Sequence, residues 1–132
     1  MPRTTKATRA SSVAERRARI VAFCLALPEA SHRAGEHIKF EVRRKTFAYY
    51  LADHHGDGRI ALNVKPAAGG QDLLMRIGPG RFFLPAYLGA KGWIGLRVDL
   101  PDIDWDEVEQ LLLDSYCLIA PKRLATLARA GS

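Results

Sequence analysis

The fold is decided by residues 36–65, EHIKFEVRRKTFAYYLADHHGDGRIALNVK. Apolar and polar residues alternate in this stretch with a period of two, which is the period of a β-strand that buries one face. The alternation predicts three strands, over residues 36–42, 46–51 and 59–65. The pair Arg43-Arg44 makes a tight turn between the first two strands, and a glycine-containing turn at residues 53–58 precedes the third. We therefore expect an antiparallel meander.

Helical periodicity flanks this meander on both sides. Ser12, followed by Glu15 three positions later, predicts the start of a first helix that Pro28 ends. The later elements are a short helix over 71–77, strands over 82–87 and 93–99, a long helix capped by Asp104, and a terminal helix opened by Pro121. The sequence thus predicts an α+β fold, a mainly antiparallel sheet with helices on one face, in the order α-β-β-β-α-β-β-α-α.

Length and charge indicate one domain with a basic arm. A chain of 132 residues is of ordinary single-domain size. Residues 1–11 have no apolar periodicity and are predicted to be a flexible basic N-terminal arm, while residues 12–132 form the single domain. The net charge is +6, yet 14 basic and 13 acidic residues follow residue 19. Most of the excess positive charge therefore belongs to the arm and the start of the first helix.

The two cysteines and the hydropathy pattern bear on the compartment. Cys24 and Cys117 fall within predicted helices among apolar neighbours, which predicts two reduced structural thiols. No apolar run approaches the roughly 20 residues that span a bilayer. We therefore expect a cytoplasmic protein that does not interact with a membrane.

Residue patterns typical of enzymes and metal sites are missing from the sequence. His32, His37, His54 and His55 come without a Cys-x-x-Cys or His-Glu-x-x-His spacing. Helix capping accounts for the carboxylates at residues 102–109. Phosphate-binding glycine motifs and Gly-x-Ser-x-Gly are also missing. The sequence therefore predicts no catalytic residue, no metal site, no cofactor and a non-enzymatic function.

Basic and aromatic residues predict a binding surface instead. The alternation places six side chains on the sheet face that the helices leave open: Lys39, Tyr50, Asn63, Lys65, Trp93 and Arg97. Lysine and arginine neutralise phosphates, and aromatic rings stack on bases. We predict double-stranded DNA as the partner, held by two hairpin tips and part of the open face, namely Arg43, Arg44, Lys45, Lys91, Trp93 and Arg97.

Two alternatives stay open. An exposed aromatic patch around Trp93 and Tyr50, flanked by Lys39, Asn63 and Lys65, could instead bind a protein partner. The acidic helix from Asp104 to Asp114 is the only feature in favour of a frataxin-like metal carrier.

Five segments together resemble the MmcQ/YjbR family. They are His37 to Lys45, Thr46 to Tyr49, His54 to Gly58, Tyr87 to Trp93 and Ala120 to Leu124, and the resemblance covers about residues 13–128. It implies a compact α+β fold similar to the frataxin/CyaY fold and to a double-wing DNA-binding domain of a phage transcription factor. It also implies a DNA-binding role, by analogy of fold, and it transfers no catalytic residue or cofactor.

The chain departs from the family pattern in two places. Arg44 stands where members often have glycine in the Arg-Gly-Lys hairpin, so a turn with positive φ is less comfortable here. The segment from Gly89 to Trp93 replaces Asn-Lys-x-His-Trp, so only Lys91 and Trp93 carry over.

Overall fold

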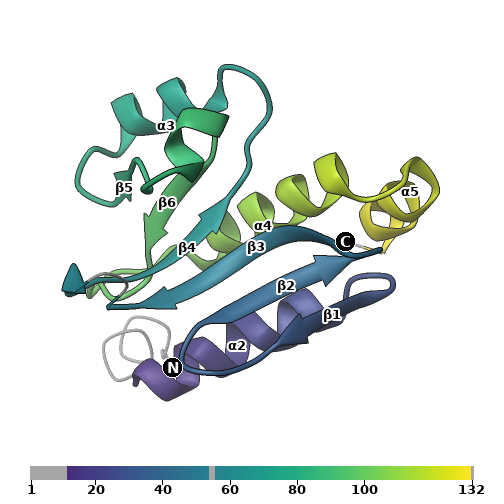
Figure 1. The fold of residues 1–132 in the computed structure, drawn as a ribbon, viewed down its shortest axis with the longest axis horizontal. Helices are drawn as coiled ribbons and strands as arrows, with labels where there is room; N and C mark the ends of the chain where they lie inside the picture. The colour runs from purple at the N-terminus through teal and green to yellow at the C-terminus, as the bar shows by residue number, and fades with distance from the viewer. Residues whose placement is uncertain (1–11, 54–55, 132) are drawn as a thin grey trace, which may run out of the picture.

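Six antiparallel strands form one sheet in the order β1-β2-β3-β4-β6-β5 in the computed structural model, which describes residues 12–53 and 56–131 (Figure 1). The strands are β1 (Ala30–Arg33), β2 (Ile38–Val42), β3 (Lys45–Ala52), β4 (Ile60–Val64), β5 (Phe82–Phe83) and β6 (Ile94–Arg97). The helices are α2 (Val13–Leu25), α3 (Gly70–Ile77), the 3₁₀ turn η2 (Leu88–Lys91), α4 (Trp105–Ile119) and α5 (Lys122–Ala130). The predicted fold class is confirmed. The predicted arm and the His54-His55 pair lie outside the described residues.

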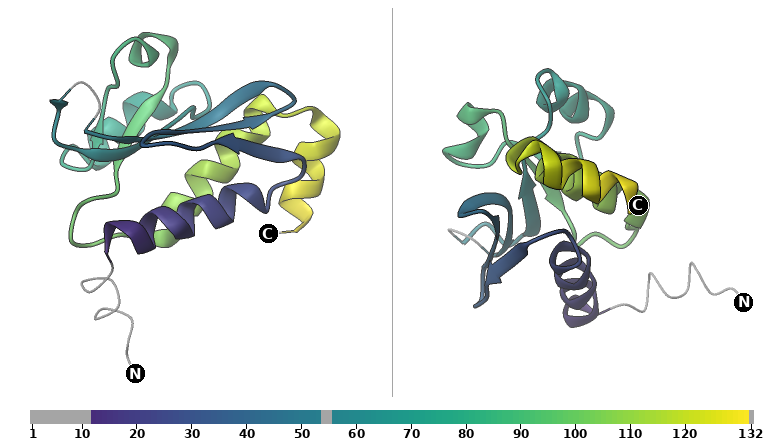
Figure 2. Two further views of the ribbon diagram at one scale, coloured as in Figure 1. Left: turned by 60° about the horizontal axis from the view of Figure 1, so that its bottom comes forward. Right: turned by 90° about the vertical axis from the view of Figure 1, so that its right-hand side faces the viewer.

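The core lies between the sheet and helices α2 and α4. Ile20 of α2, Leu112 and Tyr116 of α4, and Phe40 and Phe47 of the sheet are fully buried in it. Figure 2 shows both helices along one side of the sheet, with α5 at its end. The apolar stripe of each helix therefore covers the apolar face of the sheet.

Both long helices start at the caps that the sequence predicts. The Ser12 hydroxyl accepts the backbone N–H of Glu15, whose carboxylate accepts the N–H of Ser12, which completes a capping box. Asp104 accepts the backbone N–H groups of Asp106 and Glu107 at the start of α4.

Two strand predictions need correction. Strand β1 is missing from the strands that the sequence predicts, because its four residues, ASHR, carry no apolar alternation. It forms through backbone pairing with β2, and the ring of His32 stacks on that of Phe40 in β2. The strand predicted over 82–87 ends at Phe83, because Pro85 has no N–H to donate and Tyr87 has φ of 63°.

A β-bulge in β3 decides which residues face the core. Phe40 pairs with Ala48 and Glu41 pairs with Thr46, so Phe47 is an extra residue in the strand. The extra residue reverses the alternation that the sequence predicts for this strand. Tyr50 therefore lies in the core, with 2% of its surface exposed, and its placement on the open face was wrong.

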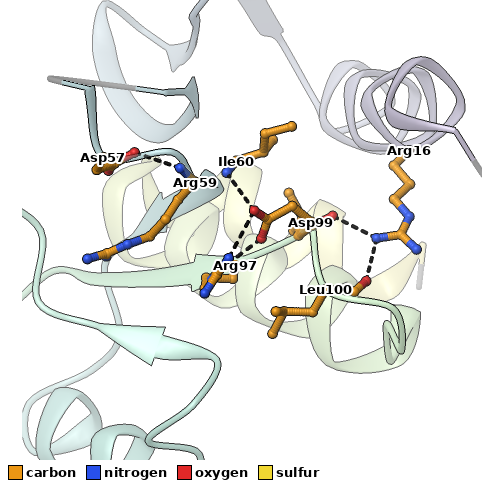
Figure 3. Close-up of polar contacts among 8 residues, drawn as sticks. Arg16, Asp57, Arg59, Ile60, Arg97, Asp99 and Leu100 are labelled. Atoms are coloured by element: carbon orange, nitrogen blue, oxygen red, sulfur yellow. Dashed lines mark hydrogen bonds and ion pairs between the residues drawn. The ribbon is translucent and has the colours of Figure 1, made fainter.

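Arginines near the start of α2 hold the fold together rather than facing solvent as free charges. Arg16 is buried, and its guanidinium donates to the carbonyl oxygens of Val98 and Leu100, at 3.0 and 2.6 Å (Figure 3). Arg17 lies over the ring of Tyr50 and Arg19 over that of Trp105. Arg16 is therefore committed to packing, and Arg17 and Arg19 each lie against an aromatic ring, which a count of charges does not reveal.

Candidate functional site

The β2–β3 hairpin carries three adjacent cations at its tip. Arg43 and Arg44 have φ of 50° and 68°, so both form the turn in the left-handed region. The side chains of Arg43, Arg44 and Lys45 are exposed. Arg43 donates two hydrogen bonds to Glu29, one of them at 3.1 Å. The hydrogen bond from Arg43 and its charge lower the pKa of the Glu29 carboxyl, so this carboxylate stays charged to a lower pH than an isolated glutamate would.

Tertiary contacts bring further cations to the hairpin. Arg123, in the first turn of α5, lies 3.7 Å from the Glu29 carboxylate that also binds Arg43. Lys65 follows β4 beside Phe47 near the start of β3, where the Ser115 hydroxyl accepts its backbone N–H and donates to the carbonyl of Phe47. We call this group the basic end; its members are Arg43, Arg44, Lys45, Lys65, Lys122 and Arg123.

Carboxylates gather near the start of α4, although two of them pair with arginines there, Glu107 with Arg81 and Glu109 with Arg19. Figure 1 shows α5 beside the β2–β3 hairpin at one end of the sheet, while α4 begins toward the other end. The first turns of α4 and the segment before it carry the carboxylates of Asp102, Asp104, Asp106, Glu107 and Glu109. The 15 residues of α4 place about 22 Å between its two ends. Three carboxylates near the basic end are paired with cations: Glu29 and Asp114 with arginines, and Glu41, which lies opposite Thr46, with Arg33 and Lys39.

Three of the six residues predicted to bind DNA are not members of the basic end. Lys91 is exposed on η2, at the same end of the sheet as the hairpin tip, because the start of β6 pairs with the end of β4. Trp93 is 7% exposed and packs on Tyr49, with ring centroids 5.8 Å apart. Arg97 donates two hydrogen bonds to Asp99, which also accepts the N–H of Ile60 (Figure 3). Neither Trp93 nor Arg97 presents a free group at the basic end.

The two aromatic residues predicted to bind a protein partner, Tyr50 and Trp93, are both buried. Tyr50 faces the core, and Trp93 is covered by the chain that runs from β5 through η2 to β6, where Gln71 donates to the carbonyls of Gly89 and Trp93. Trp93 and Tyr50 therefore do not form an exposed patch.

The open face of the sheet is hollowed rather than flat. Paired residues place Lys39, Tyr49 and Asn63 in one row across β2, β3 and β4. The segment 83–88 rises beside this row and encloses a hollow of about 660 Å³, which we call the open-face hollow. Its lining includes Lys39, Tyr49, Asn63, Arg59 and Phe83. Two of the predicted interaction-face residues, Lys39 and Asn63, thus meet in one cavity.

A family model for YjbR matches residues 25–118. The chain belongs to the YjbR family. The predicted resemblance is thereby confirmed, and the match spans every strand of the sheet. Among solved structures, the crystal structure of the Deinococcus radiodurans protein DR2400, with the family-model domain DUF419, is similar with a TM-score of 0.63 and 21% identity. The similarity covers 81% of this chain and 77% of that chain, and it shows the shared fold alone. No curated protein matches the chain.

Chemically reactive groups are not clustered in the described part of this YjbR-family protein. Its residues 12–53 and 56–131 contain no group of three or more histidine, cysteine or acidic side chains that could hold a metal ion. Cys24 and Cys117 are free thiols. Burial raises the pKa of both thiols, which is opposite to the shift that activates a cysteine nucleophile.

No helix formed by the described residues is long and apolar enough to cross a membrane.

Proposed function

We propose that this YjbR-family protein is a non-enzymatic protein that binds double-stranded DNA with its basic end. The observation that carries the proposal is that Arg43 and Arg123, from separate parts of the chain, share the carboxylate of Glu29 at the end of the sheet where the other members of the basic end also lie. Phosphate neutralisation by lysine and arginine supplies most of the affinity of non-specific DNA binding. Lys91 adds an outer contact at the same end of the sheet.

The basic end also keeps cations where they disfavour folding. Arg44 has φ of 68°, a conformation in which glycine would be more stable than arginine. Lys122 and Arg123 occupy the first turn of α5 with no acidic residue, although cations are unfavourable at a helix N-terminus. Residues that break a local rule without a compensating gain in stability are expected at functional sites.

The substitution Arg44→Gly separates DNA binding from stability, because it should stabilise the fold and at the same time weaken DNA binding. Removal of the strained turn residue should raise the free energy of unfolding by about 0.5–1 kcal/mol. Loss of one phosphate contact should weaken binding to a mixed-sequence duplex by about fivefold to eightfold at 0.1 M salt. Fluorescence anisotropy and urea denaturation of the same sample measure both effects.

The salt dependence of DNA affinity reports how many DNA phosphates the protein contacts. Replacement of both Lys122 and Arg123 by glutamine should make the slope of log Kobs against log salt shallower by about 1.8. Arg76→Gln is the matched control, because Arg76 is an exposed cation of α3 that pairs with Asp72 away from the hairpin. Affinity that disappears when residues 1–11 are removed, and that ignores the basic-end substitutions, would place binding in the arm and refute the proposal.

A further inference from the structure

The open-face hollow contains a buried polar group without a partner. Asn63 is 3% exposed, and its Oδ1 accepts no hydrogen bond from any described residue. It lies in the wall of the hollow, between Tyr49 on β3 and Gly95 on β6. Buried side-chain oxygens are nearly always paired, and one without a partner carries a desolvation cost. A donor from a molecule in the hollow would remove that cost.

The hollow also holds a cation that forms no ion pair with a described carboxylate. Arg59 lies with its guanidinium 4.1 Å above the ring of Phe83. Asp57 also lines the hollow, but its carboxylate accepts the backbone N–H of Arg59, and no carboxylate of the described residues lies within ion-pair distance of the guanidinium. Figure 3 shows the side chain of Arg59 pointing away from the Arg97–Asp99 pair. A stacked guanidinium is held flat, and its N–H groups can bind a planar oxyanion.

Shape and apolar surface define the rest of the ligand. Phe83 pairs with Gly95, and a methyl group on Gly95 would collide with the Phe83 ring, so the ring lies against the sheet and forms one apolar side of the hollow. Tyr49 provides a second aromatic surface, and Leu84 and Leu88 line the wall. Lys39 and Arg33 line the opposite side, where both pair with Glu41. A volume of about 660 Å³ is typical of sites for small organic molecules.

We propose that the open-face hollow binds a flat organic anion that carries a hydrogen-bond donor, in the class of hydroxy-substituted aromatic carboxylates. The carboxylate binds Arg59, the aromatic body lies against Tyr49 and the edge of the Phe83 ring, and the hydroxyl donates to Asn63. The hollow and the basic end share no residue, so this site is independent of DNA binding.

Three probes that differ by one group each test the proposal on the full chain. They are 6-hydroxy-2-naphthoate, 2-naphthoate, which lacks the donor, and 2-naphthol, which lacks the anion. Titrations followed by amide chemical shifts should place 6-hydroxy-2-naphthoate at β3, β4 and residues 83–88. It should bind about tenfold more tightly than 2-naphthol and about threefold more tightly than 2-naphthoate.

Two substitutions assign each difference to a residue. Arg59→Gln should bring the affinities of 6-hydroxy-2-naphthoate and 2-naphthol together, and Asn63→Leu should do the same for 6-hydroxy-2-naphthoate and 2-naphthoate. Arg76→Gln should change neither ratio, because Arg76 lies outside the hollow. Should Asn63→Leu fail to fold, the wild-type ratios and Arg59→Gln still decide the matter. Absence of binding at millimolar concentration, shifts elsewhere in the molecule, or equal affinities for all three probes would overturn the proposal.

Discussion

Ser115→Ala should destabilise the protein by about 3 kcal/mol, because one hydroxyl joins three elements. Ser115 is fully buried on α4. Its Oγ accepts the N–H of Lys65 at 2.8 Å and donates to the carbonyl of Phe47 at 2.6 Å. Alanine would leave both backbone groups unpaired, at a cost of about 1–3 kcal/mol each. With roughly 2.1 cal/mol/K of unfolding entropy per residue, a loss of about 3 kcal/mol lowers Tm by about 11 °C for a chain of this length.

Urea denaturation measures the loss, and amide hydrogen exchange at Lys65 reports on the broken bond directly. Ser31→Ala is the matched control, since Ser31 is exposed on β1 and its loss should stay within about 0.5 kcal/mol. Because Phe47 is the extra residue of the β3 bulge, the variant should also loosen the pairing that turns Tyr49 toward the open face. A loss below about 1 kcal/mol, with unchanged exchange at Lys65, would refute this account of the bridge.

Two further predictions concern β6. Burial by itself would raise the pKa of Asp99, but hydrogen bonds from Arg97 and the N–H of Ile60 outweigh it, so the pKa is lowered. Stabilisation by Asp99 is therefore complete above the pKa of its carboxyl in the unfolded chain, and it is lost as the pH falls through the lower pKa of the folded protein. The difference in stability between wild type and Asp99→Asn should vanish in acid below pH 3.8. A difference that does not change with pH would contradict this account. Gly95→Ala should cost about 1–3 kcal/mol through its collision with Phe83. Phe83→Leu should recover part of that loss in a double-mutant cycle, and additive losses would argue against the collision.

Most of the fold could be predicted from local patterns. The apolar alternation located β2, β3, β4 and β6, and side-chain caps located the starts of α2 and α4. Strand β1 gave no signal because its pairing uses backbone groups and its side chains are mainly polar. The bulge could not be read because Phe47, Ala48, Tyr49 and Tyr50 are all compatible with a buried position. With no polar residue among them to mark the solvent side, the strand accepts either register.

The candidate sites depend on contacts between residues that are far apart in the sequence. A charge count cannot show that Arg123 approaches Glu29, or that the Arg16 guanidinium donates its hydrogen bonds to backbone carbonyl groups after β6. The hollow likewise requires the segment 83–88 to stand beside the open face, where an extended strand had been predicted. Alternation alone placed Lys39 and Asn63 on that face, but it did not place Tyr49 there, because the bulge in β3 was not predicted.

The six cations of the basic end give that end of the molecule a local positive potential. Such a molecule is expected to rotate in the field of a polyanion before contact, so that it arrives with the hairpin leading. Orientation during approach raises the association rate constant and leaves the dissociation rate constant nearly unchanged. The same local potential should make encounters with anionic surfaces of any kind fast at low ionic strength and slow once counterions screen it.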